Sequence, residues 1–394
     1  MHAPTPEVVS LGCRLNIAES DQVRALLAGR DAVVINSCAV TGAAVKQTRV
    51  AIRRARRERP DAELVVTGCA ATIDAAGFAA MPEVDRVIPN AAKLLPASWG
   101  APGAVASPAR RHARAFVPVQ NGCDHSCTFC IIPQGRGPSR SESADAVVER
   151  VAALVADGCR EVVLTGVDLT SYGPDLSGAT LGALCERILT DVPGLARLRL
   201  SSLDSVEIDP ALFALLASEP RMMPHVHLSL QAGNDLVLKR MKRRHLRHDA
   251  IALIAGLKAR RDVAVGADLI AGFPTETTAM FADTLALLDD ADIVHAHIFP
   301  YSAREGTPAA RMPQVAVEVR RARATALRAR AAERKAAWLR SLVGTTQDVL
   351  VEKPGDRGHA GNFAEVRLSD APVGTVQRVT VVGAGADHLV GTAN

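Results

Sequence analysis

The N-terminal part of the chain alternates short apolar runs with longer polar and apolar stretches of helical period. The apolar runs at residues 7–13, 31–38 and 63–69 each have the length of a buried strand, and helical stretches from Ile17 to Arg30 and from Gly42 to Arg59 separate them. This βαβαβ order predicts parallel strands in an open α/β sheet, whose ligands bind beyond the carboxyl ends of the strands. We therefore predict an N-terminal open parallel α/β domain over residues 1–98.

A second region repeats this alternation after a break. Residues 99–114 lose the apolar period and become rich in Pro, Ala and Arg, which indicates a linker. Six strand-like runs with helical stretches between them then follow, at residues 115–120, 161–167, 196–202, 225–231, 263–272 and 292–302. Six βα units predict a barrel or partial barrel with active residues on the loops after its strands. Together with a long helix from Val315 to Leu342, this region spans residues 115–343.

The tail from residue 344 to 394 changes character once more. Four short apolar runs, at residues 347–352, 363–368, 376–382 and 388–391, are separated by Gly-rich turns. This pattern predicts a small all-β domain, either a barrel or a sandwich. Because no stretch of 18 apolar residues occurs, we expect no membrane span.

Composition narrows the class of protein. With 394 residues and 48% apolar content, the chain can build ordinary globular cores. Eight cysteines are too sparse for a disulfide scaffold and the N-terminus lacks a charged-then-apolar leader, so we expect a cytoplasmic protein whose thiols are reduced or metal-bound. Basic runs at residues 46–59 and 239–248 could contact phosphates or be solvated helix faces. An aromatic content of 3% argues against a single-strand binder built on stacked bases.

Six of the cysteines form two groups of three. Cys13, Cys38 and Cys69 stand at the ends of the three N-terminal strands, and parallel strands would bring them to one edge of the sheet. This placement predicts a shared metal site. The other two cysteines, Cys159 and Cys185, have no partner spacing and are expected in the core.

The second group, Cys123, Cys127 and Cys130, has CxxxCxxC spacing and follows the first barrel strand. A [4Fe–4S] cluster takes one thiolate on each iron, so three cysteines leave one iron free for a substrate or cofactor. A zinc ion is the alternative, with His112 or His125 completing the four ligands of a structural site.

The sequence GCDHSCTFCIIPQGRGPSRS on a six-unit barrel resembles the radical S-adenosylmethionine enzymes. The resemblance implies that Cys123, Cys127 and Cys130 hold a [4Fe–4S] cluster whose free iron binds the amino and carboxylate groups of S-adenosylmethionine. Reduction would then cleave the sulfonium bond and yield a 5′-deoxyadenosyl radical. By the same resemblance, Phe129 lies near the adenine of the cofactor.

The phrases LGCRLN, INSCAVT, VTGCAA, LSLQAGNDLVLKRMKRRH and DLIAGFPTET, with a TRAM-like tail, are similar to the methylthiotransferases over nearly the whole chain. The resemblance implies a second [4Fe–4S] cluster on Cys13, Cys38 and Cys69. It also implies two uses of S-adenosylmethionine, one to methylate a cluster-associated sulfur and one to generate the radical, so that C–H becomes C–SCH₃. Asp168 and Gln231 are candidate cofactor contacts, although each could be a helix cap or turn former.

The phrases LTGVDLTSYG, CIIPQGRGPSRS and LKRMKRRH look most like the branch acting on N6-threonylcarbamoyladenosine. We therefore expect 2-methylthio transfer to that nucleoside in the tRNA anticodon stem-loop, driven by a cytosolic low-potential electron donor. Arg136 and Arg140, beside the cluster loop, could contact phosphates or be surface arginines of a connecting segment. The alternatives are the isopentenyladenosine branch, a ribosomal-protein aspartate as substrate, another radical reaction such as tRNA methylation, and a non-catalytic zinc-dependent nucleic-acid-binding protein.

Overall fold

The computed structural model describes residues 5–101 and 113–393, which fall into two compact units. Of these residues, the first unit contains 5–101, 121–140 and 302–310, and the second contains 113–120, 141–301 and 311–393. Most of the expected linker, residues 102–112 with His112, lies outside the described residues.

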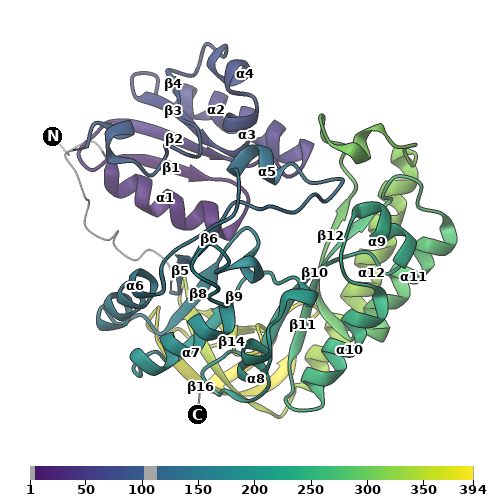
Figure 1. The fold of residues 1–394 in the computed structure, drawn as a ribbon. Helices are drawn as coiled ribbons and strands as arrows, with labels where there is room; N and C mark the ends of the chain where they lie inside the picture. The colour runs from purple at the N-terminus through teal and green to yellow at the C-terminus, as the bar shows by residue number, and fades with distance from the viewer. Residues whose placement is uncertain (1–4, 102–112, 394) are drawn as a thin grey trace. The chain divides into compact units, whose positions relative to one another are not determined.

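The first unit is built on a parallel sheet in the order β1-β2-β3-β4 (Figure 1). Val23 and Leu27 of the α1 region pack on one face of the sheet, and Ile52 and Ala55 of α2 pack on the other. The sheet is therefore doubly wound, as the βαβαβ pattern predicts. Its elements are β1 (Glu7–Ser10), α1 (Arg14–Leu26), β2 (Ala32–Ser37), α2 (Gly42–Glu58), β3 (Glu63–Gly68), α3 (Cys69–Ile73), α4 (Ala75–Ala79), β4 (Arg86–Val87), η1 (Pro96–Trp99) and α5 (Ile132–Arg136).

The second unit contains the six expected barrel strands, all parallel. They form two three-stranded sheets, β5-β8-β9 and β10-β11-β12, which isolated bridges such as Leu203 to Leu228 connect. Two three-stranded parallel sheets joined by isolated bridges make a partial barrel, so the predicted fold is confirmed. The strands are β5 (Ala115–Pro118), β8 (Glu161–Thr165), β9 (Arg197–Leu200), β10 (His225–Gln231), β11 (Ala264–Ala271) and β12 (Ile293–Pro300).

Apolar side chains of these strands pack against the surrounding helices in one large core, which also buries Cys159 and Cys185 as expected. The helix α12 (Val317–Ser341) contributes Ala324 and Leu327 to this core. The other helices and short elements are α6 (Ala144–Ala156), η2 (Leu169–Ser171), α7 (Leu181–Asp191), η3 (Ser205–Glu207), α8 (Pro210–Ser218), α9 (Asp235–Met241), α10 (Arg247–Lys258), α11 (Thr278–Asp290) and η4 (Pro308–Arg311), with the paired strands β6 (Gln120–Asn121) and β7 (Arg140–Ser141).

The C-terminal segment closes into a small β-barrel in the order β13-β14-β15-β17-β16, drawn in yellow in Figure 1. Its strands are β13 (Thr346–Glu352), β14 (Arg357–Ala360), β15 (Glu365–Arg367), β16 (Val376–Ala384) and β17 (Leu389–Ala393). The sequence pattern predicted four of these strands and missed β14, because its residues RGHA carry no apolar alternation. Among the described residues, no helix is both long and apolar enough to cross a membrane.

Candidate metal centres

The carboxyl ends of β1, β2 and β3 lie level with one another, because Ser10 pairs with Asn36 and Ser37 pairs with Gly68. Cys38 directly follows β2, Cys69 begins α3 directly after β3, and Cys13 is the residue before α1. Parallel pairing in this register places all three cysteines at one edge of the sheet, which is the gathering that the strand pattern implied.

The three thiols interact electrostatically. Burial gives the largest increase in the pKa of the Cys38 thiol, and the neighbouring Cys13 and Cys69 raise that pKa further, while a hydrogen bond with the Val40 backbone opposes the increase. Three thiolates at this edge would repel one another unless a cation compensated their charge. The donor set therefore fits a metal ion or an iron–sulfur cluster, whose positive charge stabilises deprotonated thiols.

Two glycines allow this gathering. Gly12 has a φ of +93° and Gly68 a φ of +94°, in the region that side-chain-bearing residues rarely adopt. A Cβ on Gly12 would lie 2.7 Å from the Sγ of Cys38, and one on Gly68 would lie 2.4 Å from the Ser37 carbonyl oxygen. Each glycine directly precedes a cysteine of the group, so any other residue there would displace Cys13 or Cys69.

The second cysteine group lies in a loop with its own hydrogen bonds. The Cys123 N–H donates to the Gly137 carbonyl at 3.1 Å, and the Cys130 N–H donates to the Cys127 carbonyl at 3.1 Å. The Ile132 N–H donates to the Sγ of Cys130 at 3.4 Å. Such a bond favours the thiolate form that iron or zinc requires. Phe129 is half-buried within the group.

This loop belongs to the same compact unit as the N-terminal sheet, although in sequence it follows the first barrel strand. Ile131 packs in one apolar cluster with Cys69. The side-chain amide of Asn90 donates to the Gly135 carbonyl at 2.5 Å and to the Sγ of Cys69 at 3.5 Å. Asn90 thus connects the sheet-edge cysteines to the segment that follows the second cysteine group.

A buried charge network makes a second connection in the same unit. The Arg136 guanidinium donates to both carboxylate oxygens of Glu19, at 2.9 and 3.0 Å. It also donates to the side-chain oxygens of Asn16 at 2.6 Å and Asn121 at 2.9 Å. The Lys93 ammonium donates to the same Glu19 carboxylate at 2.5 Å. We call Glu19, Lys93 and Arg136 the buried charge triad.

The buried charge triad combines two basic side chains with one carboxyl group, and its three side chains are almost completely inaccessible to solvent. Burial opposes the charged form of Glu19, but Lys93 and Arg136 together lower its pKa. Burial also opposes the charge of Arg136, yet Glu19 and the cysteines Cys69 and Cys13 raise its pKa. Burial and the neighbouring Arg136 lower the pKa of Lys93, although Glu19 opposes this. The positive charge that acts on the cysteines is therefore chiefly that of Arg136, which fits anionic thiolate ligands.

Arg136 was expected to contact phosphates or to lie on the surface, and the structure contradicts both expectations. Its side chain is buried and bonded within the protein, so it cannot contact phosphate as proposed for it, whereas Arg140 is exposed. Glu19, Lys93 and Asn90 are site residues that the sequence pattern does not predict. No spacing signal could have found them, because Glu19 is separated from Lys93 by 74 positions and from Arg136 by 117.

Asp168 and Gln231 lie in the second unit, at the carboxyl ends of β8 and β10. The Asp168 N–H donates to the side-chain oxygen of Gln120 at 2.9 Å, and its carboxylate accepts from the Ser171 hydroxyl at 2.9 Å. Gln231 ends β10 with a φ of +68°, after a shift in register. Both positions agree with the expected loop ends, and Asp168 also forms the turn that begins η2.

Most arginines of the two basic runs are paired with acidic side chains. In the first run, Arg49, Arg53, Arg54, Arg56 and Arg59 pair with Asp74, Glu83, Glu58, Asp85 and Asp31. In the second run, Arg243 and Arg244 pair with Asp204, and Arg247 pairs with Asp290. The basic runs are therefore less positive as surfaces than their sequences imply, although exposed pairs of this kind are weak and can exchange partners.

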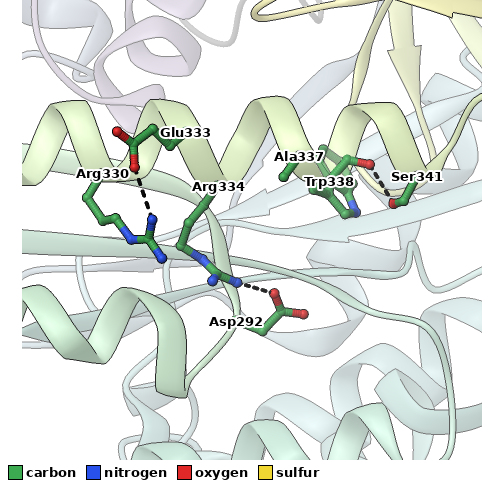
Figure 2. A pocket seen from close by; sticks show the side chains of 7 residues that line it. All are labelled: Asp292, Arg330, Glu333, Arg334, Ala337, Trp338 and Ser341. Atoms are coloured by element: carbon green, nitrogen blue, oxygen red, sulfur yellow. Dashed lines mark hydrogen bonds and ion pairs between the residues drawn. The ribbon is translucent and has the colours of Figure 1, made fainter.

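Figure 2 shows a pocket of about 320 Å³ between α12 and the residue before β12. Arg334 pairs with Asp292, and Arg330 pairs with Glu333 on the same helix (Figure 2). The lining residues are Asp292, Arg330, Glu333, Arg334, Ala337, Trp338 and Ser341, and none of the predicted site residues is among them. This pocket gives no support for a cofactor site.

Comparison with known families assigns two segments. Residues 117–288 match the radical SAM superfamily, and residues 6–89 match the uncharacterized protein family UPF0004. Solved structures agree on the fold. The radical S-adenosylmethionine methyltransferase TsrM from Kitasatospora setae aligns with a TM-score of 0.52 and 18% identity over 75% of this chain and 68% of that chain. The cobalamin-dependent radical enzyme OxsB aligns with a TM-score of 0.52 and 11% identity over 84% and 56%.

Relatives that match nearly the full length of this chain identify its family. The chain is 45% identical to the threonylcarbamoyladenosine tRNA methylthiotransferase MtaB of Rickettsia prowazekii, over 96% of this chain and 94% of that protein. It is 35% identical to the tRNA-2-methylthio-N(6)-dimethylallyladenosine synthase of Sorangium cellulosum, over 98% and 89%. The synthase of the same name from Erythrobacter litoralis is 33% identical, over 99% and 97%. These matches leave no support for the non-catalytic zinc-binding alternative.

Proposed function

The chain belongs to the tRNA methylthiotransferases of the radical S-adenosylmethionine superfamily, and we propose that it inserts a methylthio group at C2 of N6-threonylcarbamoyladenosine beside the tRNA anticodon. The observation that carries the choice of nucleoside is the near full-length match to the threonylcarbamoyladenosine enzyme, whose identity exceeds that of either dimethylallyladenosine relative. A tRNA-modifying enzyme works where tRNA is, so we expect a cytoplasmic location and a cytosolic low-potential electron donor.

Membership of the superfamily implies a [4Fe–4S] cluster and S-adenosylmethionine. We assign the first cluster to Cys123, Cys127 and Cys130 in a radical domain of residues 115–343, and a second to Cys13, Cys38 and Cys69 in a domain of residues 1–98. When bound, a three-cysteine cluster leaves one iron for S-adenosylmethionine and supplies the electron that cleaves it. Residues 99–114 would be the linker, and residues 344–394 a TRAM-like tRNA-binding domain.

The protein's own groups support both cluster assignments. The Ile132 N–H and the Asn90 amide donate hydrogen bonds to the Sγ atoms of Cys130 and Cys69. Hydrogen bonds to cluster sulfurs and nearby charge are the main means by which a protein sets a cluster's reduction potential. The Arg136 guanidinium in the same compact unit acts in the same direction, since its positive charge stabilises the more negative, reduced form.

We further propose that Phe129, Asp168 and Gln231 contact S-adenosylmethionine. Phe129 is half-buried, and in the sequence it stands between the proposed cluster ligands Cys127 and Cys130. Asp168 and Gln231 stand at the carboxyl ends of barrel strands, where residues of βα loops bind ligands in barrels of this kind. The left-handed backbone of Gln231 turns the chain sharply at the end of β10.

For the tRNA, we propose a mainly electrostatic grip on phosphates, with the target base turned out of its loop. Phe363 does not provide a free stacking surface, because it packs between the rings of His225 and His359. The small β-barrel therefore contributes charge and shape rather than base stacking.

Nucleoside mass spectrometry of tRNA tests the function. Deletion of the gene should remove the 2-methylthio form of N6-threonylcarbamoyladenosine, and restoring the gene should return it. A gene with Cys127→Ala is the matched inactive control. Loss of the 2-methylthio form of dimethylallyladenosine instead would reassign the substrate to the other branch. Persistence of both modified nucleosides, with no second enzyme of this family in the cell, would exclude the proposed function.

A further inference from the structure

Three potential metal ligands meet on neighbouring strands of the second unit. His227 on β10 pairs in register with Gly266 on β11, and Asp268, two residues further along β11, pairs with His297 on β12. Because side chains alternate between the faces of a strand, Asp268 lies on the same face as Gly266. The residues that flank Asp268, Ala267 and Leu269, belong to the apolar core on the opposite side.

The three side chains converge on one point. The Nε2 of His227 lies 3.1 Å from the Oδ1 of Asp268, and the Nδ1 of His297 lies 3.3 Å from the same oxygen. One ligand atom from each residue lies within 4.8 Å of the other two, and the imidazole ring centroids are 4.5 Å apart. Gly266 makes room for this arrangement, because a Cβ there would lie 2.4 Å from the Nδ1 of His227.

The cluster is buried on one side and open on the other. The side chain of His227 is 8% exposed, that of Asp268 is 22% exposed and that of His297 is 59% exposed.

We propose that His227, Asp268 and His297 bind one divalent transition-metal ion, Zn²⁺ or Fe²⁺, with positions left open for an oxygen ligand. Two imidazole nitrogens and one carboxylate oxygen form the ligand set of many zinc and non-haem iron sites that keep open positions. The partial exposure at His297 provides access for the ion and for its oxygen ligand. This site is separate from the six proposed cluster ligands and goes beyond the proposed function.

A second histidine–aspartate pair in the same unit provides a control for the proposed site. His248 and Asp249 are chain neighbours on α10, with the Nε2 of His248 3.1 Å from the Asp249 Oδ1, and the His248 side chain is 74% exposed. No second imidazole accompanies this pair among the three-ligand groups of the described residues. His248→Ala is therefore a matched control that removes an equally close pair without altering the proposed site.

The test is zinc binding by protein whose cysteines are already occupied by iron–sulfur clusters. Dialysis against limiting Zn²⁺ with metal analysis should find one bound zinc per chain and unchanged iron. Asp268→Asn and His297→Ala should each weaken zinc binding at least 10-fold, and His248→Ala should match the unmodified protein. Iron content and thermal melting show whether each variant remains folded.

X-ray absorption at the zinc edge identifies the ligands. Nitrogen and oxygen ligands at about 2.0–2.2 Å support the histidine–aspartate site, whereas sulfur at about 2.3 Å would assign the zinc to cysteines and overturn the proposal. Absence of zinc binding, or equal binding by folded Asp268→Asn protein, would overturn it as well. None of these outcomes depends on tRNA modification, so the proposed function stands or falls separately.

Discussion

The buried charge triad gives a quantitative expectation for Arg136→Met. The substitution keeps the length of the side chain but removes four hydrogen bonds, two to Glu19 and one each to Asn16 and Asn121. Removing one partner of a buried ion pair typically costs about 3–5 kcal/mol. Because Lys93 still neutralises Glu19, we expect the lower end, about 3 kcal/mol, which is a factor of more than 100 in an opening equilibrium.

Hydrogen exchange of the cluster-loaded protein measures this effect locally. Amides of α1 and α5 should exchange at least 100-fold faster in Arg136→Met, because the two helices lose the side chain that joins them. The matched control is Arg140→Met, an exposed arginine whose side chain contacts only nearby carbonyls, for which we expect less than about 0.5 kcal/mol. Unchanged protection of α1 in folded Arg136→Met protein would refute the reasoning.

Three further expectations follow from particular residues. Cys13→Ala should leave reductive cleavage of S-adenosylmethionine running while abolishing methylthio transfer, whereas Cys185→Ala, in the apolar core, should keep the full iron content; iron analysis with product assays checks both. Glu161→Gln should flatten the pH dependence of unfolding of the cluster-free protein between about pH 5 and 2. Burial would raise the pKa of Glu161, but contacts with Arg199, Arg114 and Arg197 lower it to about 2. The ionised Glu161 therefore contributes roughly 3 kcal/mol to the free energy of unfolding above its ordinary pKa, and this contribution is lost as pH falls. The affinity for tRNA should fall steeply between 50 and 200 mM salt in a filter-binding assay, and an affinity independent of salt would contradict an electrostatic grip.

The sequence predicted the parts of the fold whose hydrophobic period is strong. In β2 and β3, apolar residues follow one another without alternation, because helices cover both faces of the sheet. The placement of Cys13, Cys38 and Cys69 at one edge of the sheet could also be predicted, because parallel strands fix where their carboxyl ends lie. In contrast, β14 has no apolar alternation, and only its pairing with β13 and β15 makes it a strand.

The buried contacts of the candidate site could not be predicted in the same way. Arg136 follows a cysteine loop and has the appearance of a surface arginine in the sequence, yet the fold places it against Glu19. The same limit applies to His227, Asp268 and His297, which become neighbours only through strand register. Charged and polar residues carry no periodic signal of their partners, so pairings between distant positions require the structure.

The buried charge triad has a role that stability alone does not explain. Replacing a complete buried ion network by apolar side chains of similar volume is often neutral or stabilising, because the ions no longer pay for desolvation. An apolar replacement of Glu19, Lys93 and Arg136 could therefore fold, but it would remove the positive charge of Arg136 that acts on Cys13 and Cys69. Since a metal-bound thiolate group is anionic, that charge favours occupied over empty cysteines. The triad thus links the position of the cluster loop to the electrostatics of the sheet-edge cysteines.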